Sequence, residues 1–235
     1  MAAVILEARG LARRFGGLRA VDGVDLDLRR GEIHALIGPN GAGKTTLVSL
    51  LCGRIAPSAG SIAFEGRDIT RLPAHARVRL GIAYTFQITS IYPRLTVFEN
   101  VELAAQRRGT EGLAARTAEA LDRVGLGAVA ASRAGDLAYG HQRLVEIAMG
   151  LALAPKLLIL DEPTQGLANS EVEAFARLVR GLAGETTILL IEHNMELVMT
   201  LAERITVLNF GRVLATGTPE AIRADQGVQA AYLGV

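Results

Sequence analysis

The sequence predicts an α/β fold with one largely parallel sheet, interrupted by a helical insertion. Short apolar segments typical of strands alternate with helical segments through most of the 235 residues, an order that favours parallel strands joined by helices. Between about residues 88 and 154 the strand-like segments stop, and alanine-rich segments punctuated by glycines take their place. We therefore expect a single domain with a core of residues 1–87 and 155–235 and a helical subdomain at about 88–154.

The composition predicts a well-packed domain that is specialised neither for nucleic acid nor for spanning a membrane. Hydrophobic residues make up 50% of the chain and charged residues 21%, which supplies a sizeable core and excludes a disordered chain. The 25 Lys and Arg nearly balance the 24 Asp and Glu, so the chain lacks the basic excess of a nucleic-acid-binding protein. The most apolar stretch, 144–160, is too short and too often interrupted to span a bilayer. We expect a cytoplasmic protein that reaches a membrane only by docking on another protein.

Core strands are expected where short apolar runs are bounded by glycine, proline or polar residues. Val24, Leu26 and Leu28 alternate with Asp25 and Asp27, the pattern of a half-buried strand. The other expected strands lie at residues 32–37, 61–65, 82–86, 157–160, 186–191 and 204–208.

Helices are expected between these strands and throughout the insertion. Thr96 and Glu99 have the spacing of a capping box, which predicts a helix start inside the insertion. Pro219 follows Thr218, and because proline is favoured at the first helical position, the last helix is expected to begin there. The other expected core helices lie at residues 43–54, 73–80, 170–182 and 195–202.

Residues 38–45, GPNGAGKT, fit the phosphate-binding pattern G-x-x-x-x-G-K-[ST] between an expected strand and an expected helix. The glycines allow backbone N–H groups to turn toward phosphate oxygens, and the helix that follows points unpaired donors at the same anion. Lys44 is expected to reach the β- and γ-phosphates of a nucleotide, and the Thr45 hydroxyl to ligate Mg²⁺. The predicted nucleotide contacts are Gly38, Pro39, Asn40, Gly41, Ala42, Gly43, Lys44, Thr45 and Thr46.

The apolar strand at 157–160 leads directly into two acids, Asp161 and Glu162. Parallel sheets bind their ligands at the carboxyl ends of their strands. Because neighbouring residues on a strand point in opposite directions, the two carboxylates are expected to have different tasks. Asp161 suits the shell of Mg²⁺, and Glu162 suits polarising a water for attack on the γ-phosphate.

Several other enzyme classes lack their motifs in this chain. The guanine-reading Asn-Lys-x-Asp motif is absent, as are the G-x-S-x-G nucleophile turn and the H-E-x-x-H zinc helix. His34 and His75 have no partner pattern and are expected to be surface or satisfied core residues. A P-loop small-molecule kinase stays open, although the pair Arg107–Arg108 is the nearest approach to its arginine-rich lid.

Further motifs, in their order along the chain, resemble the ATP-binding subunit of ABC transporters. Phe15 stands where this family has an aromatic residue that stacks on adenine, and Gln87 matches the glutamine that contacts Mg²⁺ and water. His193 matches the switch histidine that senses the γ-phosphate. The segment in place of the family's signature Leu-Ser-Gly-Gly-Gln comprises Leu137, Ala138, Tyr139, Gly140 and His141.

The resemblance covers essentially the whole chain. It implies a P-loop NTPase (RecA-like) core with an N-terminal antiparallel β subdomain and a helical subdomain insertion. It also implies an ATPase that uses ATP and Mg²⁺, with Glu162, His193 and Gln87 as catalytic residues. Its expected partners are membrane permease subunits, a solute-binding protein and a second ATP-binding chain, at the inner face of the cell membrane.

Within this family, segments such as FGGLRAVDGV and IEHNMELVM most resemble the ATPase subunits of branched-chain amino acid importers. The stretch between Gln87 and Leu137 is shorter than this subunit type leads us to expect. An apolar groove formed by Ile88, Ile91, Tyr92 and Leu95 would suit a helix of the permease.

The chain departs from the family pattern at four positions, three of them in the signature segment. Ala138 lacks the serine hydroxyl, Tyr139 replaces a glycine, His141 replaces a glutamine, and Ala168 replaces a downstream aspartate. A lost hydroxyl donor costs on the order of 1 kcal/mol of phosphate binding, so we interpret these changes as tuning. A soluble ABC ATPase unconnected to transport and a non-hydrolytic regulatory subunit remain as alternatives, and the sequence is compatible with either a homodimer or a heterodimer.

Overall fold

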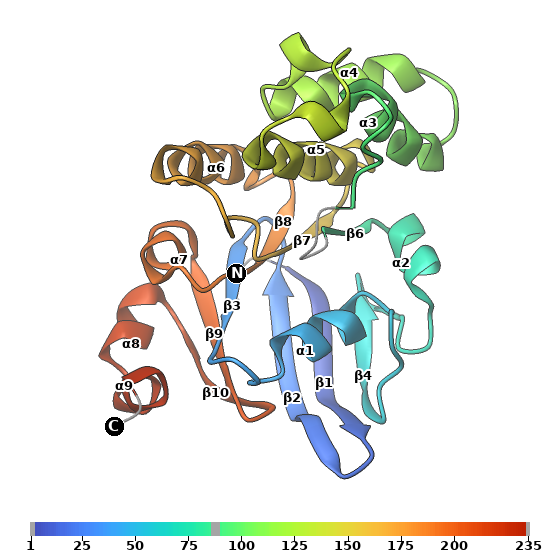
Figure 1. Ribbon diagram of the computed structural model, residues 1–235. Helices are drawn as coiled ribbons and strands as arrows, with labels where there is room; N and C mark the ends of the chain where they lie inside the picture. The colour runs from blue at the N-terminus through green and yellow to red at the C-terminus, as the bar shows by residue number, and fades with distance from the viewer. Residues whose placement is uncertain (1–2, 86–89, 234–235) are drawn as a thin grey trace.

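The computed structural model describes residues 3–85 and 90–233, built around two β-sheets (Figure 1). The first sheet is antiparallel and has the order β2-β1-β4-β5, which confirms the N-terminal antiparallel β subdomain. Val24, Leu26 and Leu28 are buried in it, as their alternation predicts. Its strands are β1 (Val4–Phe15), β2 (Leu18–Arg29), β4 (Ala59–Phe64) and β5 (Arg67–Asp68).

The second sheet confirms the predicted parallel core. Its strands are β3 (Ile33–Ile37), β6 (Ile82–Thr85), β7 (Leu157–Asp161), β8 (Thr187–Ile191), β9 (Arg204–Asn209) and β10 (Arg212–Gly217). They have the order β10-β9-β3-β8-β7-β6, and all neighbours pair in parallel except β10, which runs antiparallel to β9. Every residue of β3, β7 and β8 is buried, because both faces of this sheet are covered.

The parallel sheet separates two hydrophobic clusters, since successive strand residues point to opposite faces. Leu157 and Ile159 join the antiparallel sheet and helix α1 (Lys44–Leu51) in one cluster. Leu158 and Leu160 join the helices on the other face. Helix α1 therefore lies between the two sheets (Figure 1).

The segment between β6 and β7 supplies α3 (Val97–Ala105), α4 (Leu113–Arg123) and α5 (Tyr139–Ala152). They pack together beyond the parallel sheet, in the green to yellow part of Figure 1. The predicted capping box opens α3: the Glu99 amide donates to the Thr96 hydroxyl at 3.1 Å, and the Thr96 amide donates to the Glu99 carboxylate at 2.7 Å.

The remaining helices lie along the core. They are α2 (Ala74–Leu80), α6 (Asn169–Leu182), α7 (Met195–Leu201), α8 (Pro219–Ala224) and α9 (Gln226–Leu233). The expectation that the helix at Pro219 is the last one is wrong, because Asp225 ends it and α9 follows. No helix among residues 3–85 and 90–233 is long and apolar enough to cross a bilayer.

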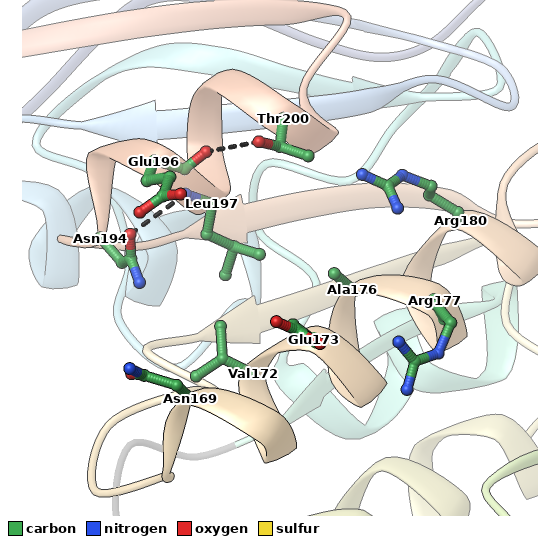
Figure 2. A pocket seen from close by; sticks show the side chains of 10 residues that line it. All are labelled: Asn169, Val172, Glu173, Ala176, Arg177, Arg180, Asn194, Glu196, Leu197 and Thr200. Atoms are coloured by element: carbon green, nitrogen blue, oxygen red, sulfur yellow. Dashed lines mark hydrogen bonds between the residues drawn. The ribbon is translucent and has the colours of Figure 1, made fainter.

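A groove of about 420 Å³ runs between α6 and α7 (Figure 2). Charged side chains of α6, among them Glu173, Arg177 and Arg180, line one side of it, and residues of α7 line the other. On the α7 side, Asn194 caps the helix by accepting from the Leu197 amide at 3.1 Å. The groove holds no residue of the predicted site.

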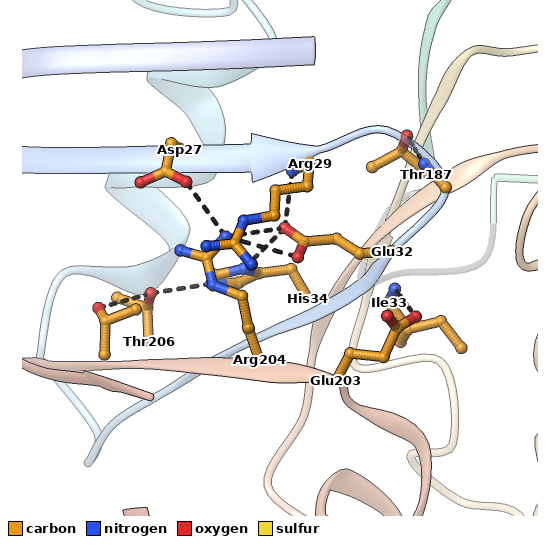
Figure 3. A network of polar contacts seen from close by, with 11 residues as sticks. Asp27, Arg29, Glu32, Ile33, His34, Thr187, Glu203, Arg204 and Thr206 are labelled. Atoms are coloured by element: carbon orange, nitrogen blue, oxygen red, sulfur yellow. Dashed lines mark hydrogen bonds and ion pairs between the residues drawn. The ribbon is translucent and has the colours of Figure 1, made fainter. Parts of the chain in front are cut away.

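A buried polar network joins the antiparallel sheet to the parallel one (Figure 3). His34, fully buried, contacts the Glu32 carboxylate at 3.2 Å and the Thr206 hydroxyl at 2.8 Å. The Arg204 guanidinium donates to Glu32 at 3.3 Å and to Asp27 of β2 at 3.1 Å. His34 is thus a satisfied core residue, as expected, and the exposed His75 is a surface residue.

Candidate functional site

The predicted phosphate-binding loop connects β3 to α1, and its backbone geometry explains its glycines. Gly38 and Gly43 have φ angles of 154° and 102°, which L side chains rarely adopt. A Cβ atom at Gly38 would lie 2.2 Å from the Leu208 carbonyl oxygen, and one at Gly43 would lie 2.3 Å from the Ala20 carbonyl oxygen. The loop is therefore held between β9 and β2, where other residues do not fit.

Lys44 begins α1 with its side chain folded back over the loop. Its ammonium donates to the carbonyl oxygens of Gly38 at 2.6 Å and Pro39 at 3.1 Å. Burial lowers the pKa of Lys44, and the carboxylates of Glu162 and Asp161 partly oppose this shift. The first turn of α1 contains no acidic residue, and no side chain caps it, so its amides suit an anion.

Asp161 is the buried end of β7. Its Oδ2 accepts a hydrogen bond of 2.8 Å from the Tyr84 hydroxyl on the neighbouring strand β6. Burial raises the pKa of Asp161; the Tyr84 hydrogen bond opposes this effect, and the negative charge of Glu162 adds to it. Burial also raises the pKa of Tyr84, so the phenol remains a donor. Sequence reasoning missed Tyr84, whose signal was its position on an expected strand that pairs with β7.

Glu162 and His193 form a pair at the ends of β7 and β8. The Glu162 Oε1 lies 2.7 Å from the His193 Nε2. Glu162 has a φ of 48°, an unfavourable conformation for a side-chain-bearing residue that persists where surrounding contacts enforce it. One such contact is the hydrogen bond of 2.9 Å from its amide to the Ile191 carbonyl.

Glu192 holds the loops after these two strands together, and sequence reasoning missed it. Its buried carboxylate accepts from the Thr164 hydroxyl at 2.6 Å and amide at 3.0 Å, and from the His193 amide at 3.0 Å. The available signal was an acid directly after an apolar strand, as at Asp161 and Glu162. Glu192 therefore positions the Glu162–His193 pair.

The loop, Glu162 and His193 border one cavity of about 570 Å³, a size that suits a nucleotide. Its opposite wall comes from β2 and from the turn between β9 and β10. The lining residues are Leu18, Arg19, Ala20, residues 40–46, Glu162, His193, Phe210 and Gly211.

Other predicted site residues lie elsewhere. Phe15 is exposed at the end of β1, outside the cavity lining, with the Arg13 guanidinium 4.8 Å from its ring centre. Gln87, like Ile88 of the expected docking groove, falls outside the described residues. The signature segment lies at the start of α5, away from the cavity; Gly140 is buried, Leu137 half-buried, and Ala138, Tyr139 and His141 exposed.

Few side-chain oxygen atoms near the phosphate loop are available as ligands for a cation. Within the described ranges, no group of three or more His, Cys, Asp or Glu side chains is placed to hold a metal by itself. Mg²⁺ in nucleotide sites commonly takes one or two protein oxygens and completes its shell with phosphates and water. The Asp161 carboxylate and the Thr45 hydroxyl beside the phosphate loop are compatible with that arrangement.

Comparison with known proteins agrees with this geometry. The ABC transporter family model matches residues 21–165, and a branched-chain amino acid ATP-binding cassette transporter model matches residues 212–235. LivG of Salmonella typhimurium, a high-affinity branched-chain amino acid transport ATP-binding protein, is 42% identical, covering 100% of this chain and 99% of its own. BraF of Pseudomonas aeruginosa, with the same description, is 41% identical with the same coverage.

A solved ATP-binding cassette of an ABC transporter in its ADP conformation superposes with a TM-score of 0.91 and 27% identity over the whole of both chains. A dimeric cassette in a post-hydrolysis state with ADP and phosphate gives a TM-score of 0.81 and 26% identity, covering 92% of this chain and 99% of its own. The family match, the full-length relatives and the phosphate-loop cavity together show that this chain belongs to the ABC transporter family, as one of its ATP-binding cassette ATPases.

Proposed function

We propose that this chain is the ATP-hydrolysing subunit of an importer for branched-chain amino acids or related small solutes. The observation that carries the proposal is the Glu162–His193 pair, 2.7 Å apart, beside the phosphate loop in one cavity. The descriptions of LivG and BraF, and the match of residues 212–235, support the solute class.

The P-loop end of the cavity binds the triphosphate of the substrate ATP. Amides of residues 40–43 and of the first turn of α1 donate to phosphate oxygens, and the Lys44 ammonium exchanges its carbonyl partners for the β- and γ-phosphates. Thr45 and Asp161, with Gln87, would hold Mg²⁺, which when bound neutralises charge on the phosphate oxygens.

Glu162 orients a water molecule and accepts its proton as the water oxygen attacks the γ-phosphorus. A new P–O bond forms while the bond to the bridging oxygen breaks, which releases ADP and inorganic phosphate. His193 holds the Glu162 carboxylate through the 2.7 Å contact and senses the γ-phosphate from the same cavity wall. Glu192 keeps both loops in register.

A second ATP-binding chain completes the site. Within one chain the signature segment, Leu137 to His141, starts α5 outside the cavity, so its helix N-terminus is available to the phosphates bound by a partner chain. Phe15 contacts the adenine from the edge of the antiparallel sheet. Two chains close on ATP and reopen after hydrolysis, and this conformational cycle drives transport.

The transport partners are permease subunits and a solute-binding protein, which place this chain at the inner face of the membrane. Tyr92, exposed on the segment before α3, and the half-buried Ile91 and Leu95 supply apolar surface for a permease helix. Since Ile88 lies outside the described residues, these three carry the docking proposal. We propose no nucleic-acid partner.

Steady-state ATPase activity of the purified chain at increasing protein concentration tests this function. Glu162→Gln keeps the shape of the side chain but removes its basicity, so we expect it to bind ATP and to turn over at least ~100-fold more slowly. Glu173→Gln makes the same replacement of a carboxylate by an amide, at an exposed residue of α6 outside the cavity. It is the matched control and should leave turnover unchanged. Near-normal hydrolysis by Glu162→Gln would refute the catalytic assignment.

A further inference from the structure

The turn between β9 and β10 places an aromatic ring in solvent. Phe210 is 85% exposed, the highest value among the large hydrophobic side chains described. Its φ of 45° lies in the left-handed region, which a phenylalanine adopts only at a cost in energy. Neither burial nor backbone preference therefore explains a phenylalanine at this position.

Phe210 is held against the phosphate loop by its neighbours. The Gly211 amide donates to the Ala42 carbonyl at 2.9 Å, and the Gly211 carbonyl accepts from the Asp22 amide at 2.8 Å. The Asp22 carboxylate also pairs with Arg212 at 2.7 Å. The hairpin tip is thus fixed to both the loop and β2, and the ring borders the cavity.

The two sides of the cavity differ in chemistry. Lys44, Glu162 and His193 mark the side where phosphate is bound and hydrolysed. The other wall presents Leu18, Arg19 and Phe210, two exposed apolar side chains and a guanidinium. Apolar rings and chains cannot bind phosphate, but they suit the flat faces of a purine and the carbon atoms of a ribose.

We infer that Phe210 is a further specificity-determining residue, which contacts the nucleoside part of the bound nucleotide together with Leu18. The inference rests on the proposed function, in which the ligand is ATP. Phe15 alone leaves this wall unused, because its ring lies outside the lining and already faces the Arg13 guanidinium. Phe210 gives the nucleoside an aromatic contact that is anchored to the phosphate loop itself.

Binding of ATP and of inorganic tripolyphosphate, each titrated against the full chain by calorimetry, separates a nucleoside contact from a loop effect. We expect Phe210→Ala to raise the Kd for ATP by about fivefold or more, the scale of one aromatic–base contact. The Kd for tripolyphosphate should stay within about twofold, since the same contact cannot reach phosphate. Phe210→Tyr, which keeps the ring, should bind ATP as the wild type does.

Leu214→Ala is the matched control, because Leu214 is an exposed apolar residue (41%) of the same hairpin outside the cavity. An unchanged Kd for ATP in Phe210→Ala would overturn the inference. An equal loss for ATP and tripolyphosphate would also overturn it, because the residue would then act by shaping the loop. If the wild-type chain bound tripolyphosphate but gained nothing from the nucleoside, the proposed function would fail together with the inference.

Discussion

A buried positive charge lies at each end of helix α1, and the two charges differ in their surroundings. At the N-terminus, Lys44 has a pKa lowered by burial and borders an open cavity. At the C-terminal side, Arg77 of α2 is almost fully buried and is not among the residues that line the cavity beside Lys44. Its guanidinium donates to the carbonyls of Leu50 and Leu51 at 2.8 Å, Leu72 at 2.9 Å and Thr70 at 3.1 Å.

The difference distinguishes a charge that stabilises the fold from one that serves a ligand. Arg77 donates hydrogen bonds to carbonyls at the end of α1, where the helix dipole favours a cation. All three nitrogens of its guanidinium group donate to carbonyl oxygens of the chain itself. Lys44 sits at the unfavourable positive end, and its loop carbonyls are partners that a phosphate can replace. Burial alone therefore does not identify function; the position on the helix and access to the cavity do.

Arg77→Met should give the largest change in stability. It leaves several buried carbonyls without a donor, and we expect the free energy of unfolding to fall by about 3 kcal/mol or more. Urea denaturation followed by circular dichroism measures this loss. Arg79→Met, an exposed neighbour on α2, should change stability by less than about 0.5 kcal/mol. Equal effects of the two variants would contradict a capping role for Arg77.

Lys44→Met should weaken ATP binding and leave stability nearly unchanged, the opposite of what we expect for Arg77→Met. We expect the Kd for ATP to rise by about tenfold to a hundredfold, because charge-assisted hydrogen bonds to phosphate are lost. The nucleotide-free chain should keep its free energy of unfolding within about 1 kcal/mol. Calorimetric titration and urea denaturation of the same preparation test both parts. A stability loss as large as that of Arg77→Met would show that Lys44 is structural.

Two buried carboxylates extend the comparison to pH. Burial opposes ionisation of Glu32, but hydrogen bonds with His34 and the Arg29 amide and the charge of Arg204 outweigh it and hold its pKa below the usual value. Stability from a lowered pKa is present above the unfolded-state pKa and is lost as pH falls through the folded-state pKa. Glu32→Gln should therefore cost about 1–2 kcal/mol at pH 7, and the difference from wild type should shrink below about pH 4.3.

Asp161→Asn is the opposing control for Glu32→Gln. Because burial raises the pKa of Asp161, its ionised form disfavours folding near neutral pH. The amide should leave the free energy of unfolding at pH 7 unchanged or higher, while ATP turnover falls. Urea denaturation of both variants from about pH 3 to about pH 8 covers the titration of these carboxylates. Equal destabilisation by the two variants over this range would remove the distinction between the two sites.

Ala138→Ser should have the smallest effect. The serine hydroxyl would restore one donor at the N-cap of α5, and a hydrogen bond from it to phosphate is worth on the order of 1 kcal/mol. We therefore expect half-maximal turnover at an ATP concentration about fivefold lower. Ala131→Ser, also exposed and in the same helical region, is its control. An unchanged concentration dependence would show that the signature segment does not contact the triphosphate.

Short-range patterns were enough to predict much of this protein. Strands β3, β7 and β8 are buried throughout and mostly apolar, so their runs stand out in the sequence. The phosphate loop and the acids Asp161 and Glu162 were recognisable because their chemistry requires fixed local spacing, and the structure places Glu162 and His193 together. Their catalytic roles stay predictions until turnover is measured.

Other elements depend on partners distant in the chain. Strand β1 was missed because its pairing with β2 shifts register between Ala8 and Leu11, which interrupts the alternation that identifies a strand. Strand β10 was missed because it is a half-exposed edge strand beside β9.

The sequence by itself determined the fold class, through the alternation of strand-like and helix-like segments along the chain. It also determined the phosphate loop and the acids Asp161 and Glu162, because each of these patterns occupies consecutive residues. Only the tertiary structure decided that Arg77 caps α1, that Glu192 holds the loop carrying Thr164, and that Phe210 borders the cavity. These contacts join residues from separate elements, and their geometry is set by the packing of two sheets around one helix. No local pattern specifies such a juxtaposition.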